Sequence, residues 1–524
     1  MTYPKKLTAL LLALMMLLPV LGGCGQKEET PLTVTAVLSE VCAVPDPAMV
    51  TTDTEKTVVC HLYDNLMKLW PDSEGNVAAA SAVAKRVETE DNDDGTVTYT
   101  FTLRSDAKWS DGKAVTAGDF VYAWRRLVDP KTKSPNASLL DMVSGYADAR
   151  KGEGKKLAVT APDDTTLQVV LAHPCPYFLH VVCTAAATMP VREDSTLTNG
   201  AYRVAEQTAD ELRLTAAADY YDASRIRAAE LRLVLCDGAE AALTRCGEDD
   251  WDVAPGLAAG QDEGAQPAYY AETGVLLINR LAKKLTDPAL HQAMSLVIDR
   301  HAAAQACGAD CVAADGLIPV GICNTQGEDF RTASGALIDT VAEDYEKNCQ
   351  TARELLAQAG FDAAALKALG KVTLRYEQSQ QALAEELQTV WQQKLGLTVT
   401  LLPETAEALQ SDLQKGEFTM ALTAVRGDRN DAVGYLNTWR SGNSGNWANV
   451  HSAAYDTLLR MANVTTHAEA RDAYLGDAER LLVEDGSVMP LYFTARYVRT
   501  NHGMQGLLGD GQGVYCFAAM HPAA

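Results

Sequence analysis

The residues that could do chemistry are spread along the chain and form no catalytic motif. The nine histidines are scattered, and the patterns H-E-x-x-H, G-x-S-x-G and G-x-x-x-x-G-K do not occur. Cys307 and Cys311 have three residues between them, but no second Cys or His pair at zinc-finger spacing follows. Gly509, Gly511 and Gly513 form a glycine-rich segment with no helix pattern after it, which indicates a loop and not a phosphate site. These absences predict no metal or cofactor site and shift the expectation from an enzyme toward a binding protein.

The length and charge of the chain limit the class of protein. At about 100 to 200 residues per domain, 524 residues predict two to four domains. The composition, with 47% hydrophobic and 22% charged residues, is typical of a globular protein. Asp and Glu outnumber Lys and Arg by 69 to 45, and the net charge of −24 repels phosphate backbones. We therefore expect no nucleic acid as a partner.

The amino terminus is typical of an exported lipoprotein. Residues 1–23 contain two lysines, no acidic residue and the apolar run Leu7 to Leu21, which is the layout of a secretory signal. The run is shorter than the roughly 20 residues that span a bilayer as a helix. It ends in Leu-Gly-Gly-Cys, which resembles a bacterial lipobox with Cys24 as the acylated residue. We expect a signal peptide over 1–23 and a lipid-anchored tether over 24–31; the alternative is a conventional signal peptide.

The remaining cysteines leave their own pairing open. If Cys24 carries lipid, eleven of the twelve cysteines remain, and an odd number cannot all form disulfides. At least one thiol is therefore free. The others are either small buried hydrophobic residues or partners in one or two disulfides.

The spacing of apolar residues predicts an α/β architecture. In the first third we expect a strand over 32–38, a helix over 54–70, a strand over 96–103 and a helix from Thr116 to the Asp129-Pro130 stop. In the second half we expect a helix over 351–360 with a capping box of Thr351 and Glu354, a strand over 372–376, a helix over 380–395 and a strand over 397–402. The last three form a strand-helix-strand unit, which predicts a mostly parallel sheet.

One long motif connects the chain to a known family. Residues 106–130, DAKWSDGKAVTAGDFVYAWRRLVDP, resemble the signature region of the oligopeptide-binding proteins of ATP-driven importers. Further matches follow in family order: HPCPYF at 173–178, TNGAYRV at 198–204, ADYYD at 218–222, INR at 278–280, AMSLVIDR at 293–300, ARELLAQAGF at 352–361, GYLNTW at 434–439 and PLYF at 490–493. The resemblance covers nearly the whole chain after the tether.

This resemblance implies a two-lobed α/β clamp of the periplasmic-binding-protein type (type II, large cluster C form) that closes over its ligand. It places lobe I at 32–63, 190–283 and 491–524, an inserted domain at 64–189, and lobe II at 284–490. It also implies an extracytoplasmic monomer that is anchored to the cell membrane through Cys24. Such a protein has no catalysis of its own and delivers peptides to a two-subunit permease driven by ATPases.

The resemblance also carries candidate ligand-binding residues. The family pairs the α-ammonium of a peptide with an aspartate just before a segment like GYLNT, which is Asp428 here, with Asp431 as the fallback. A buried ammonium needs such a partner because an unpaired buried charge costs several kcal/mol. Main-chain groups for the ligand would come from Val425, Arg426 and Gly427 and, across the cleft, from Thr51, Thr52 and Asp53. The alternatives are a turn or capping role for Asp428 and helix capping for Thr51 to Asp53.

Several positions depart from the peptide-binding pattern. Asn136 stands where relatives have a tyrosine, Ala406 and Val425 where they have tryptophans, and Leu413 and Gln414 where some have the Arg and His that bind a peptide carboxylate. The amino-end anchor is thus retained and the pocket walls are not. This keeps open a non-peptide ligand such as a metal chelate, an opine or a glycoside, or a role as a receptor for a peptide signal. A surface hydrolase is the alternative from another class.

Overall fold

The computed structural model describes residues 31–71, 77–175, 177–194, 196–259, 267–325, 328–465 and 467–523. The predicted signal peptide, Cys24 and the tether up to residue 30 lie outside these ranges. Within them, no helix has both the length and the apolar character that a membrane crossing requires. None of the eleven cysteines in the same ranges is in a disulfide.

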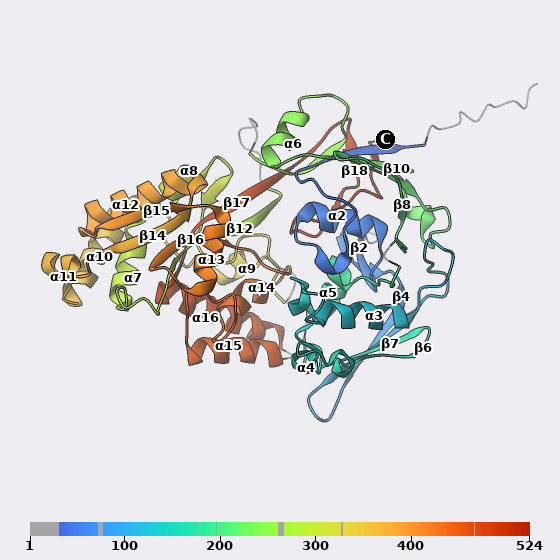
Figure 1. Cartoon of the computed structure of the whole chain (residues 1–524), viewed down its shortest axis with the longest axis horizontal. Coiled ribbons are helices and arrows are strands. Elements are labelled where there is room, and N and C mark those ends of the chain that lie inside the picture. Colours follow the sequence, from blue (N-terminus) through green and yellow to red (C-terminus); the bar gives the residue numbers. More distant parts are fainter. Residues whose placement is uncertain are drawn as a thin grey trace, which may run out of the picture.

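A single mixed sheet runs through both halves of the molecule. Its strand order is β15 (Val399–Glu404), β14 (Val372–Glu377), β16 (Met420–Val425), β12 (Tyr269–Ile278), β17 (Val488–Thr500), β11 (Val253–Leu257), β1 (Thr33–Leu38), β10 (Glu230–Leu235), β9 (Glu211–Ala216) and β8 (Tyr202–Gln207), and β13 (Cys311–Ala313) pairs with β17. We call the part with β1 and β8–β11 lobe I and the part with β13–β16 lobe II. The long strands β12 and β17 connect the two lobes (Figure 1).

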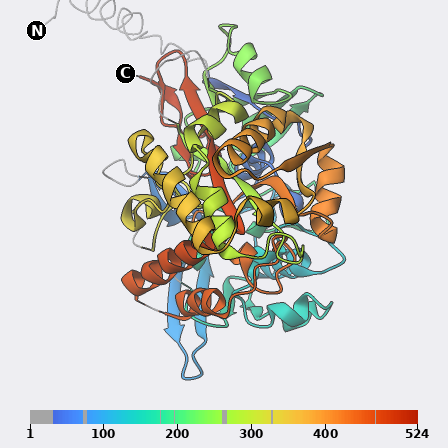
Figure 2. The same ribbon diagram turned by 90° about the vertical axis from the view of Figure 1, so that its left-hand side faces the viewer.

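Helices surround the lobe II end of the sheet, which faces the viewer in Figure 2. They are α7 (Pro288–Leu296), α8 (Arg300–Cys307), α9 (Phe330–Ser334), α10 (Tyr345–Gln358), α11 (Ala363–Ala368), α12 (Gln381–Leu395), α13 (Ala406–Lys415), α14 (Val433–Leu436), α15 (Ala453–Val464) and α16 (Ala468–Asp485). One stripe of α12 is buried, and the indole of Trp391 on it donates to the Met294 carbonyl at 3.1 Å. The predicted strand-helix-strand unit is confirmed, because β14 and β15 are parallel neighbours joined by α12. The mostly parallel sheet inferred from it is wrong, because β12 and β17 pair antiparallel with each other and with β16 and β11, and β8, β9 and β10 are also antiparallel.

Lobe I carries α2 (Asp53–Leu62), α6 (Ala239–Arg245) and the closing strands β18 (Met504–Gln505), β19 (Leu508–Gly509), β20 (Tyr515–Cys516) and β21 (His521–Pro522). The segment between α2 and β8 has sheets of its own, a hairpin of β2 (Met67–Pro71) and β3 (Val77–Ser81) and the order β4 (Ala84–Asp91), β5 (Val97–Leu103), β7 (Thr166–Leu171), β6 (Val159–Asp163). It also holds α3 (Ala117–Val128), α4 (Tyr146–Ala149) and α5 (Phe178–Thr184). The long hairpin of β4 and β5 projects at the bottom of Figure 2.

The predicted helix over 54–70 is wrong in its second half. Helix α2 ends at Leu62, and residues 67–71 form strand β2. The cause is a distant segment: the Gly200 N–H donates to the Leu62 carbonyl at 2.8 Å, and a Cβ on Gly200 would lie 2.5 Å from the Leu62 carbonyl carbon. The neighbouring Asn199 side chain accepts the N–H of Asp64 at 3.2 Å. These contacts take up backbone groups that a longer helix would use.

The predicted capping box of Thr351 and Glu354 is also wrong. Helix α10 begins at Tyr345, so both residues lie inside it. The Thr351 hydroxyl donates to the Lys347 carbonyl at 3.0 Å, one turn earlier, which is a common use of threonine within a helix. By contrast, the predicted strands over 32–38 and 96–103 and the helix begun by Thr116 are confirmed as β1, β5 and α3.

Candidate ligand-binding site

A pocket with about 610 Å³ of open space lies between lobe I, helix α5 and the loop that follows β16. We call it the cleft pocket. Its wall consists of Val50, Lys56, Asn136, Leu139, Val181, Thr184, Ala185, Ala186, Ala187, Arg426, Gly427, Asp428, Arg429, Asp510, Gln512 and Val514. Strand β16 positions the lobe II side, because its last residue, Val425, pairs with Thr273 of β12 and the loop starts there. The structure thus brings Arg426, Gly427, Asp428 and Asn136 together at one pocket.

Asp428 is on the pocket wall, but it already has a cationic partner. The Arg429 guanidinium donates from Nε to Oδ1 and from Nη2 to Oδ2 of Asp428, both at 2.8 Å. The Arg429 side chain is 3% exposed, whereas that of Asp428 is 37% exposed and faces the Ser138 hydroxyl at 3.5 Å. The arginine therefore fixes the carboxylate from the inside of the loop, and the outer lone pairs remain accessible. Sequence reasoning missed this pairing.

Asp431 does not line the cleft pocket. Its carboxylate accepts from Arg471 of α16 at 2.8 Å and from the N–H of Val433 at 2.9 Å. Both side chains of the ion pair are nearly inaccessible, at 6% for Asp431 and 0% for Arg471. This buried pair holds the loop against lobe II, so the fallback position for a ligand ammonium is occupied by a structural contact.

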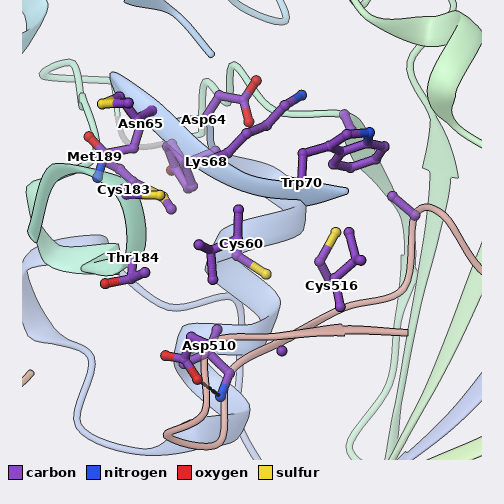
Figure 3. A pocket seen from close by; sticks show the side chains of 18 of the residues that line it. Cys60, Asp64, Asn65, Lys68, Trp70, Cys183, Thr184, Met189, Asp510 and Cys516 are labelled. Atoms are coloured by element: carbon purple, nitrogen blue, oxygen red, sulfur yellow. Dashed lines mark hydrogen bonds between the residues drawn. The ribbon is translucent and has the colours of Figure 1, made fainter. Parts of the chain in front are cut away.

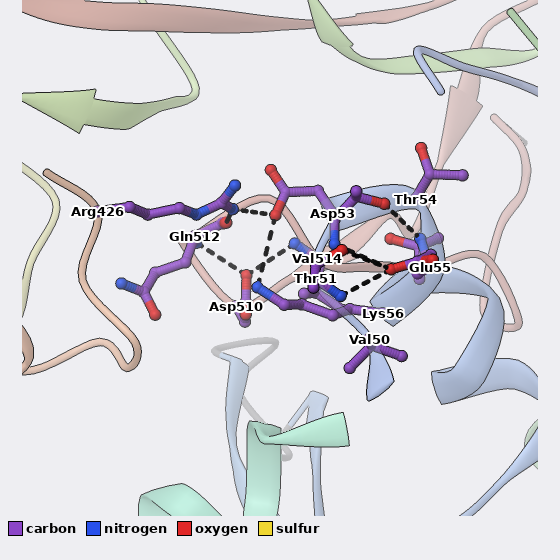
Figure 4. A network of polar contacts seen from close by, with 12 residues as sticks. Val50, Thr51, Asp53, Thr54, Glu55, Lys56, Arg426, Asp510, Gln512 and Val514 are labelled. Atoms are coloured by element: carbon purple, nitrogen blue, oxygen red, sulfur yellow. Dashed lines mark hydrogen bonds and ion pairs between the residues drawn. The ribbon is translucent and has the colours of Figure 1, made fainter. Parts of the chain in front are cut away.

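A side-chain ion pair crosses from one lobe to the other (Figure 4). The guanidinium of Arg426 contacts Asp53 at the start of α2 and also donates to the Gln512 carbonyl at 3.4 Å. The Tyr269 hydroxyl donates to the same Asp53 carboxylate at 3.1 Å. Asp53 and Arg426 were expected to offer main-chain groups to a ligand; in the structure their side chains bind each other.

Thr51 and Thr52 cap helix α2. The Thr52 hydroxyl accepts the N–H of Glu55 at 3.2 Å, and the Glu55 carboxylate accepts the N–H groups of Thr51 and Thr52 at 2.7 and 3.2 Å. This is the capping alternative of the sequence analysis. Neither threonine is part of the pocket wall, whereas Val50 is. Asn136 positions that residue by donating to the Val50 carbonyl at 2.6 Å.

Asp510 is a half-buried carboxylate of the site and comes from the glycine-rich segment that the sequence predicts to be a loop. Its side chain accepts the N–H groups of Gln512 and Val514 at 2.8 and 3.0 Å. Burial raises the pKa of Asp510 to about 6. Gly513 has φ +101°, and a Cβ there would lie 2.5 Å from Asp53, so the loop can approach α2 only with glycine. Burial lowers the pKa of the neighbouring Lys56, and the charge of Arg426 lowers it further.

Known proteins resemble this chain in sequence and in fold. Residues 78–447 match the family model "Bacterial extracellular solute-binding proteins, family 5 Middle". The dipeptide-binding protein of Lactococcus lactis is 29% identical over 93% of this chain and 94% of its own. A protein of Escherichia coli named as a probable deoxycholate-binding periplasmic protein, YgiS, is 27% identical over 86% of this chain and 85% of its own.

Among solved structures, the Escherichia coli murein tripeptide binding protein MppA superposes with a TM-score of 0.73, at 24% identity over 94% of this chain and 98% of its own. This likeness confirms the expected two-lobed α/β clamp. The family model covers well over half of the chain. The chain therefore belongs to the bacterial extracellular solute-binding proteins of family 5.

Proposed function

We propose that this protein captures short peptides in the cleft pocket and delivers them to a membrane importer. The observation that carries the proposal is the position of Asp428: a carboxylate fixed by Arg429 on one side and 37% exposed on the side of the pocket. The names of two relatives, a dipeptide-binding protein and a murein tripeptide binding protein, support the same ligand class.

The proposed binding mode uses the two free sides of the Asp428 carboxylate. Each of its oxygens accepts one bond from Arg429, and a peptide ammonium would add bonds to the remaining lone pairs. The main-chain groups of Arg426 and Gly427 lie beside it on the pocket wall and would pair with the peptide backbone. Water in the pocket would accommodate side chains of different shape.

Delivery requires export of the protein and transporter subunits that accept its ligand. We propose that residues 1–23 direct export, that Cys24 carries lipid and that the mature protein stays at the outer face of the cell membrane as a monomer. A two-subunit permease with cytoplasmic ATPases would receive the ligand. We also keep 64–189 as the inserted domain, and the separate sheets of β2–β7 support this boundary.

A non-peptide solute is the second candidate. The specific observation in its favour is that Asp53, Asp428 and Asp431 each have an arginine partner within the protein. Because these carboxylates already have cationic partners, the site needs a ligand ammonium less than a site with an unpaired carboxylate would. The name of the YgiS relative, which specifies a bile acid, supports this candidate.

Native mass spectrometry separates the two. The protein, purified with its anchor in detergent, is mixed with a random pool of two- to eight-residue peptides. Adducts selected by length and spread over sequence are the expected result. One retained species would indicate a dedicated signal peptide, and the absence of any adduct, together with an adduct of an amphipathic acid such as deoxycholate, would contradict the peptide assignment.

A further inference from the structure

A second pocket lies beside the cleft pocket and has about 700 Å³ of open space. We call it the thiol pocket. Its described wall residues come from lobe I and the 64–189 segment: Cys60, Tyr63, Asp64, Asn65, Met67, Lys68, Leu69, Trp70, Cys183, Thr184, Met189, Ala201, Tyr220, Ile226, Leu508, Gly509, Asp510, Val514, Cys516 and Ala518. Figure 3 shows the side chains of Cys60, Cys183 and Cys516 around the space between α2, α5 and β20. The cavity volume proper is about 80 Å³, well below the roughly 300 to 1,000 Å³ of a whole small-molecule site, so the pocket has room for one group of a ligand and not for all of it.

The thiols give this pocket a neutral surface. Burial raises the pKa of Cys183 to about 12 and also raises the pKa values of Cys60 and Cys516 above the ordinary thiol range. All three therefore stay protonated at neutral pH and act as small hydrophobic side chains. Large apolar side chains such as Met189 and Leu508 complete the wall.

The charged groups in the wall, Asp64, Lys68 and Asp510, all have hydrogen-bond partners within the protein. Lys68 donates to the Asp222 carboxylate and to the Tyr220 hydroxyl, both at 3.0 Å. The Asp64 carboxylate accepts the hydroxyls of Tyr220 and Tyr221. Since Lys68 is already paired with Asp222, an anionic ligand group would lose its hydration shell without gaining a free cation, whereas an apolar group carries no such penalty.

The two pockets share Thr184, Asp510 and Val514 as wall residues. The thiol pocket therefore adjoins the pocket that contains Asp428. Cys60 and Cys516 line only the second pocket, and Arg426 and Asp428 line only the first. One ligand would thus meet charged groups in the first pocket and neutral thiols in the second.

We propose that the thiol pocket is a ligand subsite that takes an uncharged hydrocarbon group of the molecule held in the cleft. The group is either an apolar residue side chain or an acyl chain, since both present the same chemistry. The subsite rests on the proposed function as a clamp that binds its ligand at the cleft pocket. It adds selection by apolar volume to recognition of the ligand backbone.

The first test needs no peptide. Crystals of the protein are exposed to xenon, which enters apolar cavities and not hydrated ones. We expect xenon density between Cys60, Cys183 and Leu508. Ordered water molecules in that space in place of xenon would overturn the proposal, whatever the protein binds in its cleft.

The second test compares matched ligands. A tripeptide series carries Ala, Leu or Phe at each position in turn, and a parallel series carries acyl chains of increasing length on one side chain. At about 0.8 kcal/mol per buried CH₂, the favoured Leu or acyl ligand should bind on the order of 10- to 50-fold more tightly than its Ala counterpart. Whichever series shows the larger gain identifies the source of the hydrocarbon group.

Two filling variants locate this preference. Cys183→Met and Cys516→Met each place a longer side chain in the thiol pocket from different walls, and Cys246→Met, outside it, is the control. We expect both filling variants to lose the preference for the larger apolar group and to keep the affinity for the Ala peptide. The control should keep both the preference and the affinity. Equal preference in all four proteins would overturn the subsite while leaving peptide binding intact. If no ligand of either series binds, the proposed function fails, and the xenon result alone decides on the subsite.

Discussion

The cleft pocket and the thiol pocket share part of one wall but differ in what they present to a ligand. The cleft pocket is bordered by Arg426, Asp428 and Arg429 from lobe II, and the thiol pocket by three neutral cysteines from the other side of the boundary. Charge recognition needs partners at fixed positions, whereas hydrophobic burial is non-directional and scales with area. Under the proposed function, one region would fix the end and the backbone of a ligand and the other would select by size.

The largest expected effect separates the two regions directly. Asp428→Asn should lower the affinity for free peptides by about 2 to 4 kcal/mol, because a buried ammonium loses its counter-charge. The loss should be the same for Ala and Leu peptides, since the thiol pocket is untouched. Titration calorimetry of both peptides measures this.

The control for this variant addresses Arg429, which Asp428→Asn would leave buried without its partner. The double variant Asp428→Asn, Arg429→Gln removes both charges and should recover the thermal stability of the wild type without recovering its affinity. Wild-type affinity in the double variant would mean that the ion pair has no part in ligand binding.

Asp510, which lines both pockets, gives a prediction for the pH dependence of the free energy of unfolding. The pKa of Asp510 rises from 3.8 in the unfolded chain to about 6 in the fold, so the folded state holds its proton more tightly. This contribution to stability is fully present below pH 3.8 and is lost as the pH rises through 6. Asp510→Asn can keep the bonds from Gln512 and Val514 and has no carboxylate to ionise. The variant should exceed the wild type by up to about 3 kcal/mol in free energy of unfolding at pH 7.5.

Urea unfolding at pH 4 and pH 7.5 measures this difference. The difference in free energy of unfolding between the Asp510→Asn variant and the wild type should be smaller at pH 4 than at pH 7.5, because at pH 4 the wild-type carboxyl is protonated in the fold. A difference that does not change with pH would show that Asp510 does not titrate as its burial requires.

These outcomes bear on what could be predicted from the sequence. Local patterns gave β5, α12 and the start of α3 correctly, because apolar periodicity and capping residues act within a few positions. The end of α2 depends on Gly200, which is distant in sequence, and no local signal marks it. The family motif placed Asp428 at the cleft.

Other features of the site had no local signal. The pairing of Asp428 with the adjacent Arg429 was not foreseen, since neighbouring side chains usually point apart and only the loop geometry turns them together. Asp510 joins the site through a glycine-rich loop near the carboxyl terminus. The thiol pocket collects Cys60, Cys183 and Cys516 from three distant segments, and only tertiary packing brings them to one cavity.

The smallest expected effect concerns the pair between the lobes. The side chains of Arg426 and Asp53 are 34% and 17% exposed, and ion pairs at such sites contribute about 1 kcal/mol or less. Arg426→Gln should therefore change peptide affinity by less than about fivefold and leave the preference of the thiol pocket unchanged. A loss of more than tenfold would mean that Arg426 contacts the ligand itself.

The central claim is that a peptide ammonium binds at Asp428. The most direct measurement is a calorimetric cycle of one tripeptide, free and N-acetylated, against the wild type and Asp428→Asn. We predict that acetylation costs the wild type about 2 to 4 kcal/mol of binding free energy and costs the variant little more. Equal penalties in both proteins, or no penalty in the wild type, would contradict the claim.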